Sequence, residues 1–437
     1  MENASSEIVI IAIILLSIAM IGGILTGYLK IPYASMLVLI GLAVGLFHIF
    51  PHLKITPAII YYVFLPILIM EGAVKFKVKT LKENLLPISV YAIFGTIIST
   101  ILSGLALHYV FRIPLKQSLL FGAIISPTDP LSIMALLKNN GSKNNKNGEG
   151  RESRENGGES GDKPRAKARA SEGIETVLEG ESLFNDGISL VLYELFLTIN
   201  FNKNPAFIIG MSSLKFLYAF LGGAILGIAL GFLISFILSF TYDYLTEIMI
   251  SILLAYISII AAYYIGVSFI ITIIFSGIIL ANYGFKKMVS SQTIQVFPIV
   301  IEFLAFVLNS LIFLLIGMEM NLFKILNFWL VSGILIVFAL FSRGFSIYIL
   351  APLINFIKQK FEIFSKGVAM NNIYKNFMIF GGLRGALSIA MALSLPLHLK
   401  MRSEIITYVF IIVLFSLTVQ GIIFDIYAKK RISRFIS

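Results

Sequence analysis

Two carboxylates interrupt an apolar stretch in the segment Gly180-Glu181-Ser182-Leu183-Phe184-Asn185-Asp186. An ionisable side chain at bilayer depth costs roughly 2.5–3.5 kcal/mol on insertion scales, so two of them this close together require a function. Glu181 and Asn185 are four residues apart, as are Ser182 and Asp186, so a helix places all four side chains on one side. A polar stripe on an apolar helix predicts the wall of an ion-binding site.

The composition is that of a polytopic membrane protein. Of 437 residues, 58% are hydrophobic and only 13% are charged, and the mean hydropathy is +0.93. A soluble domain carries about 25% charged residues, roughly twice this fraction. The chain has no cysteine, which excludes a disulfide, a thiol nucleophile and a thiolate metal site, and its histidines show no metal-ligand spacing. We expect neither an enzyme nor a cofactor-binding protein.

Apolar runs of about 20 residues predict an all-α fold with roughly thirteen membrane-spanning helices. Span five runs through the segment around Pro127, and span twelve through the segment around Arg384. The approximate bounds of the spans are 8–29, 33–50, 57–73, 85–111, 114–137, 174–200, 214–240, 245–264, 267–284, 294–318, 328–350, 374–396 and 405–426.

The distribution of lysine and arginine predicts the orientation. These residues are concentrated in the loops that follow odd-numbered spans, which the positive-inside rule places in the cytoplasm. The N-terminus is then expected outside the cell membrane and the C-terminus in the cytoplasm. Cytoplasmic loops and anionic lipid also account for the net charge of +11, so we expect no nucleic-acid partner.

Residues 139–171 differ from everything around them. They are rich in Gly, Asn, Lys, Arg, Glu and Ser and contain almost no apolar residues, a composition typical of a disordered loop. The segment joins the fifth and sixth spans on the predicted cytoplasmic side. Two interpretations remain open, a solvated insertion and a regulatory or partner-binding tether.

Spans five and twelve are each interrupted. The fifth contains Ser126-Pro127-Thr128-Asp129-Pro130, where two prolines remove backbone donors and clash with the preceding turn, so the helix should break there. The twelfth contains Gly381-Gly382-Leu383-Arg384-Gly385, where three glycines loosen the backbone around a buried arginine. Interrupted segments at matching positions of two halves predict inverted repeats, with two broken helices that cross at the transport site.

The breaks suggest roles for the residues inside them. Half-helix ends carry partial charges, so Asp129 suits the positive N-terminal ends and Arg384 suits the negative C-terminal ends. Asp129 is also a candidate for the immediate surroundings of the ion. Because an unwound stretch leaves carbonyl groups free, the carbonyl of Thr128 is expected to be a ligand for a small cation.

Asp186 is the candidate ion carrier. Because burial disfavours the charged form of a carboxyl group, a buried acid can hold a proton near neutral pH and release it to an arriving cation. Such a group binds either a proton or a cation, which is the physical basis of exchange. Asn185 offers an amide that does not ionise, and Ser182 offers a hydroxyl ligand one turn earlier.

The remaining buried charges have structural interpretations. Arg343 lies in the middle of a span and must find an acid, and both Glu181 and Glu302 are candidates for an ion pair with it. Glu71, near the inner end of the third span, either faces water or adds an oxygen to the site. Glu179 is expected to be structural.

These motifs resemble those of the monovalent cation/proton antiporters, specifically the sodium/proton exchanger branch with its prokaryotic electroneutral members. The motifs are Phe121-Gly122-Ala123-Ile124-Ile125-Ser126-Pro127-Thr128-Asp129-Pro130, Glu179-Gly180-Glu181-Ser182-Leu183-Phe184-Asn185-Asp186-Gly187 and Gly381-Gly382-Leu383-Arg384-Gly385-Ala386, with a weaker match at 65–75. The resemblance covers nearly the whole chain and implies a thirteen-span homodimer. It implies a dimerisation part near 1–84 and 241–325, a moving core near 85–200 and 326–426, and a linking helix near 214–240. The segment 139–171 is usually much shorter in similar proteins.

The resemblance also implies secondary exchange of Na⁺, and also Li⁺, for H⁺ by alternating access. Asp186 would bind Na⁺ or H⁺, and Asn185 before it marks the electroneutral one-for-one branch. Glu181 would pair with Arg343. The further sodium ligands implied are the main chain of Thr128, Ser182 and Glu71, with Asp129 beside them.

Three alternatives are weighed against this function. Exchange of K⁺ for H⁺ uses the same fold, and the sequence does not separate the cations, because they differ through cavity size and ligand number. An intramembrane aspartyl protease would use Asp129 and Asp186 as an acid pair, but prolines bracket the first and two buried arginines would have no role. A channel or a solute symporter would keep the broken helices, but the sequence offers no selectivity filter and no pocket for an organic substrate.

Overall fold

A computed structural model describes residues 2–29, 33–47, 56–129, 162–199, 204–319, 322–361, 368, 370–424 and 426–427. Within these ranges the regular secondary structure is entirely helical, without any β-strand. The prediction of an all-α fold is confirmed.

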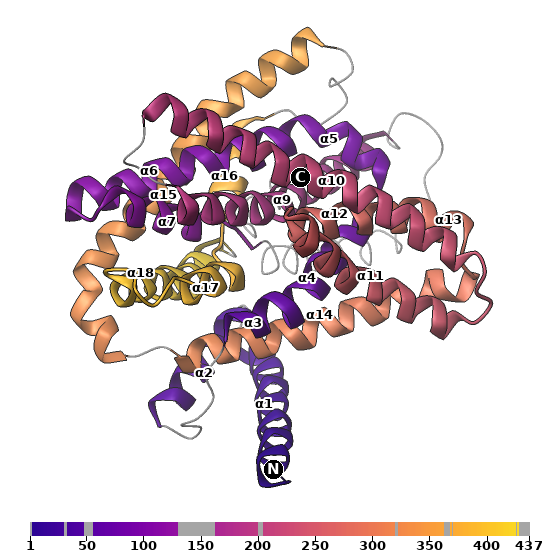
Figure 1. Cartoon of the computed structure of the whole chain (residues 1–437), viewed down its shortest axis with the longest axis horizontal. Helices are drawn as coiled ribbons and strands as arrows, with labels where there is room; N and C mark the ends of the chain where they lie inside the picture. Colours follow the sequence, from indigo (N-terminus) through magenta and orange to yellow (C-terminus); the bar gives the residue numbers. More distant parts are fainter. Residues whose placement is uncertain are drawn as a thin grey trace.

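Helices make up most of the described chain (Figure 1). Up to the middle of the chain they are α1 (Glu2–Leu29), α2 (Tyr33–Leu46), α3 (Pro57–Ile59), the π-helical turn η1 (Ile60–Phe64), α4 (Leu65–Lys75), α5 (Val78–Val90), η2 (Tyr91–Gly95), α6 (Thr96–Phe111), α7 (Leu115–Ile125) and α9 (Asp162–Thr198). The later elements are α10 (Pro205–Leu238), α11 (Tyr244–Ile265), α12 (Phe269–Ile279), η3 (Leu280–Gly284), α13 (Phe285–Lys287), α14 (Ser291–Glu319), α15 (Leu322–Lys360), α16 (Asn372–Phe380), α17 (Ala386–Leu393), α18 (Arg402–Phe415) and η5 (Ser416–Gln420).

Each predicted span overlaps a helical segment of the described chain. Eight of these segments are long and apolar enough to cross a membrane by length and composition. Helix α9 is not among them, because the carboxylates that make it a candidate site also lower its hydropathy. Helices α16 and α17 are too short to qualify singly, as expected for two halves of a broken span.

Helix α5 begins at Val78, seven residues before the predicted start of its span. The extra turns are amphipathic: Lys79 and Lys82 are exposed, whereas Leu81 and Asn84 are buried. An apolar run marks only the fully buried part of a helix, so it misses turns that bury one side. The predicted domain boundary after residue 84 therefore falls inside a continuous helix.

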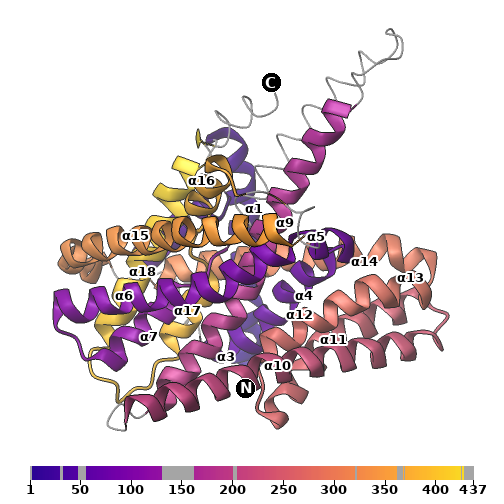
Figure 2. The ribbon, with the colours of Figure 1, turned by 90° about the horizontal axis from the view of Figure 1, so that it is seen from above.

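The predicted disordered loop is wrong at its C-terminal end. Residues 162–171 form the first turns of α9, which project away from the rest of the molecule (Figure 2), while 139–161 lie outside the described residues. Lysine, arginine, alanine and glutamate are strong helix formers, and Asp162 and Pro164 suit a first helical turn. Composition alone did not distinguish a helix rich in charged residues from a disordered segment.

The helices pack in two groups with α9 between them. Helices α5, α6, α7, α15 and α18 contact one another on one side, and α2, α4, α11, α12 and α14 on the other (Figures 1 and 2). In the second group, α2 and α14 approach closely because glycines face the opposing backbone. A Cβ atom on Gly41 would lie 2.1 Å from the carbonyl oxygen of Leu314, and one on Gly317 would lie 2.2 Å from that of Val38.

Candidate ion-binding site

The non-helical end of α7 meets the link between α16 and α17 beside α9, and this meeting point is called the crossing below. Helix α7 ends at Ile125, and the chain from Ser126 to Asp129 leaves the helical conformation. Residues 382–385 form the non-helical link between α16 and α17. The backbone N–H of Asp129 donates to the carbonyl oxygen of Leu383 over 2.7 Å, which joins the two links. Pro130 and the predicted second half of span five lie outside the described residues.

Arg384 binds the C-terminal end of the half-helix α7. Its Nη1 donates to the carbonyl oxygens of Ser126 at 2.7 Å and Pro127 at 3.1 Å, and its backbone N–H donates to Ser416 Oγ at 2.8 Å. These carbonyls carry the negative end of the helix dipole and have no partner within the helix. The guanidinium therefore supplies both charge and donors to the end of α7.

Asp129 lies at the other half-helix end. Its carboxylate packs against Gly385, the residue that caps the N-terminus of α17. A Cβ atom on Gly385 would lie 2.7 Å from both Cβ and Oδ2 of Asp129. The positive end of α17 and the absence of a side chain at residue 385 together fix the position of this acid.

Gly385→Ala should disturb the crossing without preventing the fold. The backbone at Gly385 has φ −123°, which alanine adopts freely, so the effect is purely the collision with Asp129. Because displacements of about 1 Å at a working site can reduce rates by about 100-fold, we expect transport by Gly385→Ala to fall by at least tenfold. Transport rates in proteoliposomes check this. Gly333→Ala on α15 is the control, since a Cβ there meets open space, and equal rates for both variants would contradict the prediction.

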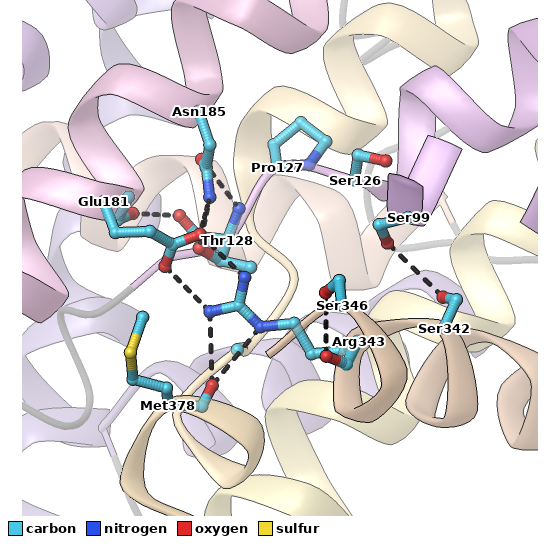
Figure 3. A network of polar contacts seen from close by, with 12 residues as sticks. Ser99, Ser126, Pro127, Thr128, Glu181, Asn185, Ser342, Arg343, Ser346 and Met378 are labelled. Atoms are coloured by element: carbon cyan, nitrogen blue, oxygen red, sulfur yellow. Dashed lines mark hydrogen bonds and ion pairs between the residues drawn. The ribbon is translucent and has the colours of Figure 1, made fainter. Parts of the chain in front are cut away.

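Glu181 and Arg343 form a buried ion pair at the centre of the polar network (Figure 3). Arg343 Nη1 donates to Glu181 Oε1 and Nη2 donates to Glu181 Oε2, each at 2.7 Å. Arg343 also donates to the carbonyl oxygen of Met378 in α16. The pair links α9 to α15 and to the first half of the broken helix. Glu302, the alternative partner, is exposed.

Asn185 connects this ion pair to the unwound end of α7. Its Nδ2 donates to Glu181 Oε1 and to Thr128 Oγ1, both at 2.8 Å, and its Oδ1 accepts the backbone N–H of Thr128 at 3.3 Å (Figure 3). The amide is fully used by these bonds and does not line the adjacent cavity. The four polar side chains of the α9 segment therefore face two directions, with Glu181 and Asn185 turned into the core.

Ser182 and Asp186 face a cavity of about 110 Å³ beside the crossing. Its walls come from α4, the unwound end of α7, α9, α14 and the start of α17. Ser182 Oγ donates to the carbonyl oxygen of Thr128. Asp186 is half-buried, and in the described part of the chain its carboxylate has no hydrogen bond and no ion pair. The polar residues that line the cavity are Glu71, Thr128, Asp129, Glu179, Ser182, Asp186 and Asn309.

The sequence matches the family described as sodium/hydrogen exchanger, transmembrane, over residues 13–430. The chain belongs to this family. It is 30% identical to a Na⁺/H⁺ antiporter of Aphanothece halophytica over 98% of the chain and 75% of that protein. It is 32% identical to the Na⁺/H⁺ antiporter NhaG of Bacillus atrophaeus over 90% of the chain and 69% of that protein.

The fold is similar to that of the sodium proton antiporter MjNhaP1 of Methanocaldococcus jannaschii, solved at pH 8. The TM-score is 0.70 at 18% identity, and the alignment covers 98% of this chain and 99% of the other. The predicted resemblance to the sodium/proton exchanger branch is confirmed. Membership of the exchanger family also excludes the protease alternative, because these relatives are transporters and not enzymes.

Three features of this exchanger-family site were not predicted. Glu179, expected to be structural, lines the cavity, as does Asn309 of α14. Lys75 forms an ion pair with Glu71 on the same helix, four residues away, a spacing that the sequence already contains. Gln420 of η5 donates to the carbonyl oxygen of Phe380 at the end of α16, and no sequence signal indicated this contact.

Proposed function

We propose that the protein exchanges Na⁺, and also Li⁺, for H⁺ across the cell membrane, with the two ions competing for Asp186. The observation that carries this proposal is the state of the Asp186 carboxylate. It lines a cavity, lies between buried residues of α9, and has no hydrogen bond or ion pair among the described residues. An acid in such surroundings gains by binding either a proton or a cation.

The sodium ligands we propose are Asp186, Ser182, the carbonyl of Thr128 and Glu71. Ser182 Oγ donates to that carbonyl, so a cation bound to both oxygens would replace one hydrogen bond by two oxygen contacts. In the described ranges no group of three or more His, Cys, Asp or Glu side chains is arranged to hold a metal. The proposed set contains only two carboxylates, Asp186 and Glu71, and the second is already paired with Lys75, which suits a transported ion that must also leave.

We propose that the exchange is electroneutral. The charge of Glu181 is matched by Arg343, and Asn185 is uncharged, so neither group needs to titrate during the cycle. Exchange of one Na⁺ for one proton on Asp186 then changes no net charge. Ion gradients would drive the cycle, and the membrane potential would not.

Access to Asp186 would alternate between the two sides of the membrane as the core, near 85–200 and 326–426, moves against the dimerisation part, near 1–84 and 241–325. The separation into two helix groups with α9 between them supports this division into moving and static parts. Following the lysine and arginine distribution, we place the N-terminus outside and the cavity end of α9, near Glu71, on the cytoplasmic side. The resemblance to the family supports a homodimer formed through the second group.

Proton flux in proteoliposomes that hold a pH gradient tests the function. Addition of Na⁺ or Li⁺ should dissipate the gradient, K⁺ should not, and a potassium–valinomycin clamp should leave the rate unchanged. If K⁺ alone dissipates the pH gradient, the transported cation is K⁺ and not Na⁺, and the proposed exchange mechanism stays the same. A rate that follows the clamped potential would contradict electroneutrality, and silence toward every cation would contradict the proposal.

Lys75→Gln should increase the apparent affinity for Na⁺. The Lys75 ammonium binds Glu71 at the edge of the cavity, and its side chain is 31% exposed against 9% for Glu71. Because partly exposed pairs contribute roughly 0.5–1 kcal/mol, removal of this tethered cation should lower the KM for Na⁺ by about two- to fivefold. Transport rates against Na⁺ concentration check this. Lys79→Gln, an exposed lysine on α5, should not change KM, and an unchanged KM in Lys75→Gln would contradict the prediction.

A further inference from the structure

Five buried hydroxyl groups and one buried amide oxygen have no hydrogen-bond partner among the described residues. Four of the hydroxyls belong to Tyr61 on η1, Ser189 and Tyr193 on α9, and Ser388 on α17, and the remaining atoms are Ser332 Oγ on α15 and Gln117 Oε1 on α7. Ser189 and Ser388 have no exposed surface, and Tyr193 is 3% exposed. Since buried polar groups are normally paired, unpaired hydroxyls on neighbouring elements require an explanation. Helix α17 contacts both α9 and η1, so the first four residues belong to one region.

The two hydroxyls on α9 continue the stripe that contains Asp186. At about 100° per residue, Ser182, Asp186, Ser189 and Tyr193 fall within an arc of about 60°. The residues of α9 that line the cavity are Glu179, Ser182, Leu183 and Asp186, and none lies beyond Asp186. One side of the helix is therefore open before Asp186 and closed after it.

The same change occurs on the two neighbouring elements. On α4 the cavity wall runs from Glu71 back to Leu65, and Tyr61 lies one turn beyond Leu65. On α17 the wall ends at Leu387, and Ser388 is the next residue. Each of these four hydroxyls lies past the last cavity residue of its element, on the side of Asp186 away from Glu71.

We propose that these four hydroxyls line the second half of the ion pathway, which is closed in this conformation. In the opposite conformation water enters between α9, α17 and η1, and the hydroxyls bind this water and the partly dehydrated cation. Their unpaired state is then a property of one conformation only. Neutral hydroxyls also add no charge that would bind the passing cation permanently. This inference rests on the proposed exchange function.

Single cysteine variants test the pathway, because the chain contains no native cysteine. Ser189→Cys, Tyr193→Cys and Ser388→Cys in proteoliposomes are treated with a charged, membrane-impermeant methanethiosulfonate, added to either side during Na⁺-driven turnover. We expect modification and loss of exchange when the reagent is on the side opposite the cavity. Ile188→Cys, equally buried on another side of α9, should stay unmodified.

If none of the three cysteines reacts, in vesicles where the protein exchanges ions before the reagent is added, the proposed pathway is wrong and the proposed function stays intact. If the protein exchanges no ions before the reagent is added, both the pathway and the proposed exchange function are wrong. A second measurement uses Ser189→Ala, which removes a hydroxyl but no hydrogen bond. We expect slower turnover with a melting temperature that is not lowered, whereas unchanged turnover would contradict a role in the pathway.

Discussion

Asp186→Asn is expected to reduce cation-driven proton flux to the level of empty liposomes. The amide keeps the size of the side chain but neither ionises nor carries a proton, so both ions lose their shared binding group. Because Asp186 has no hydrogen bond to a described residue, the substitution should leave the fold intact. Flux in proteoliposomes, with the elution profile of the purified protein as a check on folding, measures the effect.

Asp243→Asn is the matched control for this experiment. Asp243 is an exposed aspartate that caps α11 by accepting from Thr246, far along the chain from the cavity-lining residues. Its variant should exchange at the normal rate. Exchange by Asp186→Asn at the rate of Asp243→Asn would show that Asp186 has a structural role only.

Of the substitutions proposed for this protein, those that break the Glu181–Arg343 ion pair should lower its stability most. Both side chains are buried, at 1% and 5% exposure, and among the described residues each forms an ion pair only with the other. Removing one member of a buried pair leaves an uncompensated charge and costs about 3–5 kcal/mol. Arg343→Met and Glu181→Gln should each lower the melting temperature of the detergent-solubilised protein markedly.

The double variant Glu181→Gln/Arg343→Met distinguishes the loss of the ion pair from the loss of side-chain packing. Replacement of both charges removes the uncompensated group, so the double variant should be more stable than the sum of the single losses predicts. Lys215→Met, which removes an exposed cation on α10, controls for the loss of a positive charge. Additive losses in the double variant would contradict a direct ion pair.

The sequence predicted those parts of the site that depend on local chemistry. The prolines around Asp129 and the glycines around Arg384 act on the backbone at their own positions, so the two breaks were visible without a structure. The helical spacing of residues 181–186 was likewise a local property. Hydropathy located the spans but not their ends, as the early start of α5 shows.

The rest of the site depends on contacts between distant parts of the chain. Asn185 turns into the core because Thr128, 57 residues away, uses both ends of its amide. Glu179 and Asn309 share a cavity only because α9 and α14 both border the crossing. From their spacing alone, Asn185 and Asp186 were predicted to lie on the same side of α9. The spacing did not show that Asp186 faces the cavity whereas Asn185 faces the ion pair of Arg343.

The central claim is that Na⁺ and H⁺ compete for Asp186, and proton release on sodium binding tests it most directly. The purified protein, in weakly buffered detergent solution, is titrated with Na⁺ while the pH and the bound sodium are followed together. One proton should be released for each Na⁺ bound, Na⁺ should bind more weakly at lower pH, and Asp186→Asn should release no proton. Sodium binding without proton release, or release that persists in Asp186→Asn, would contradict the claim.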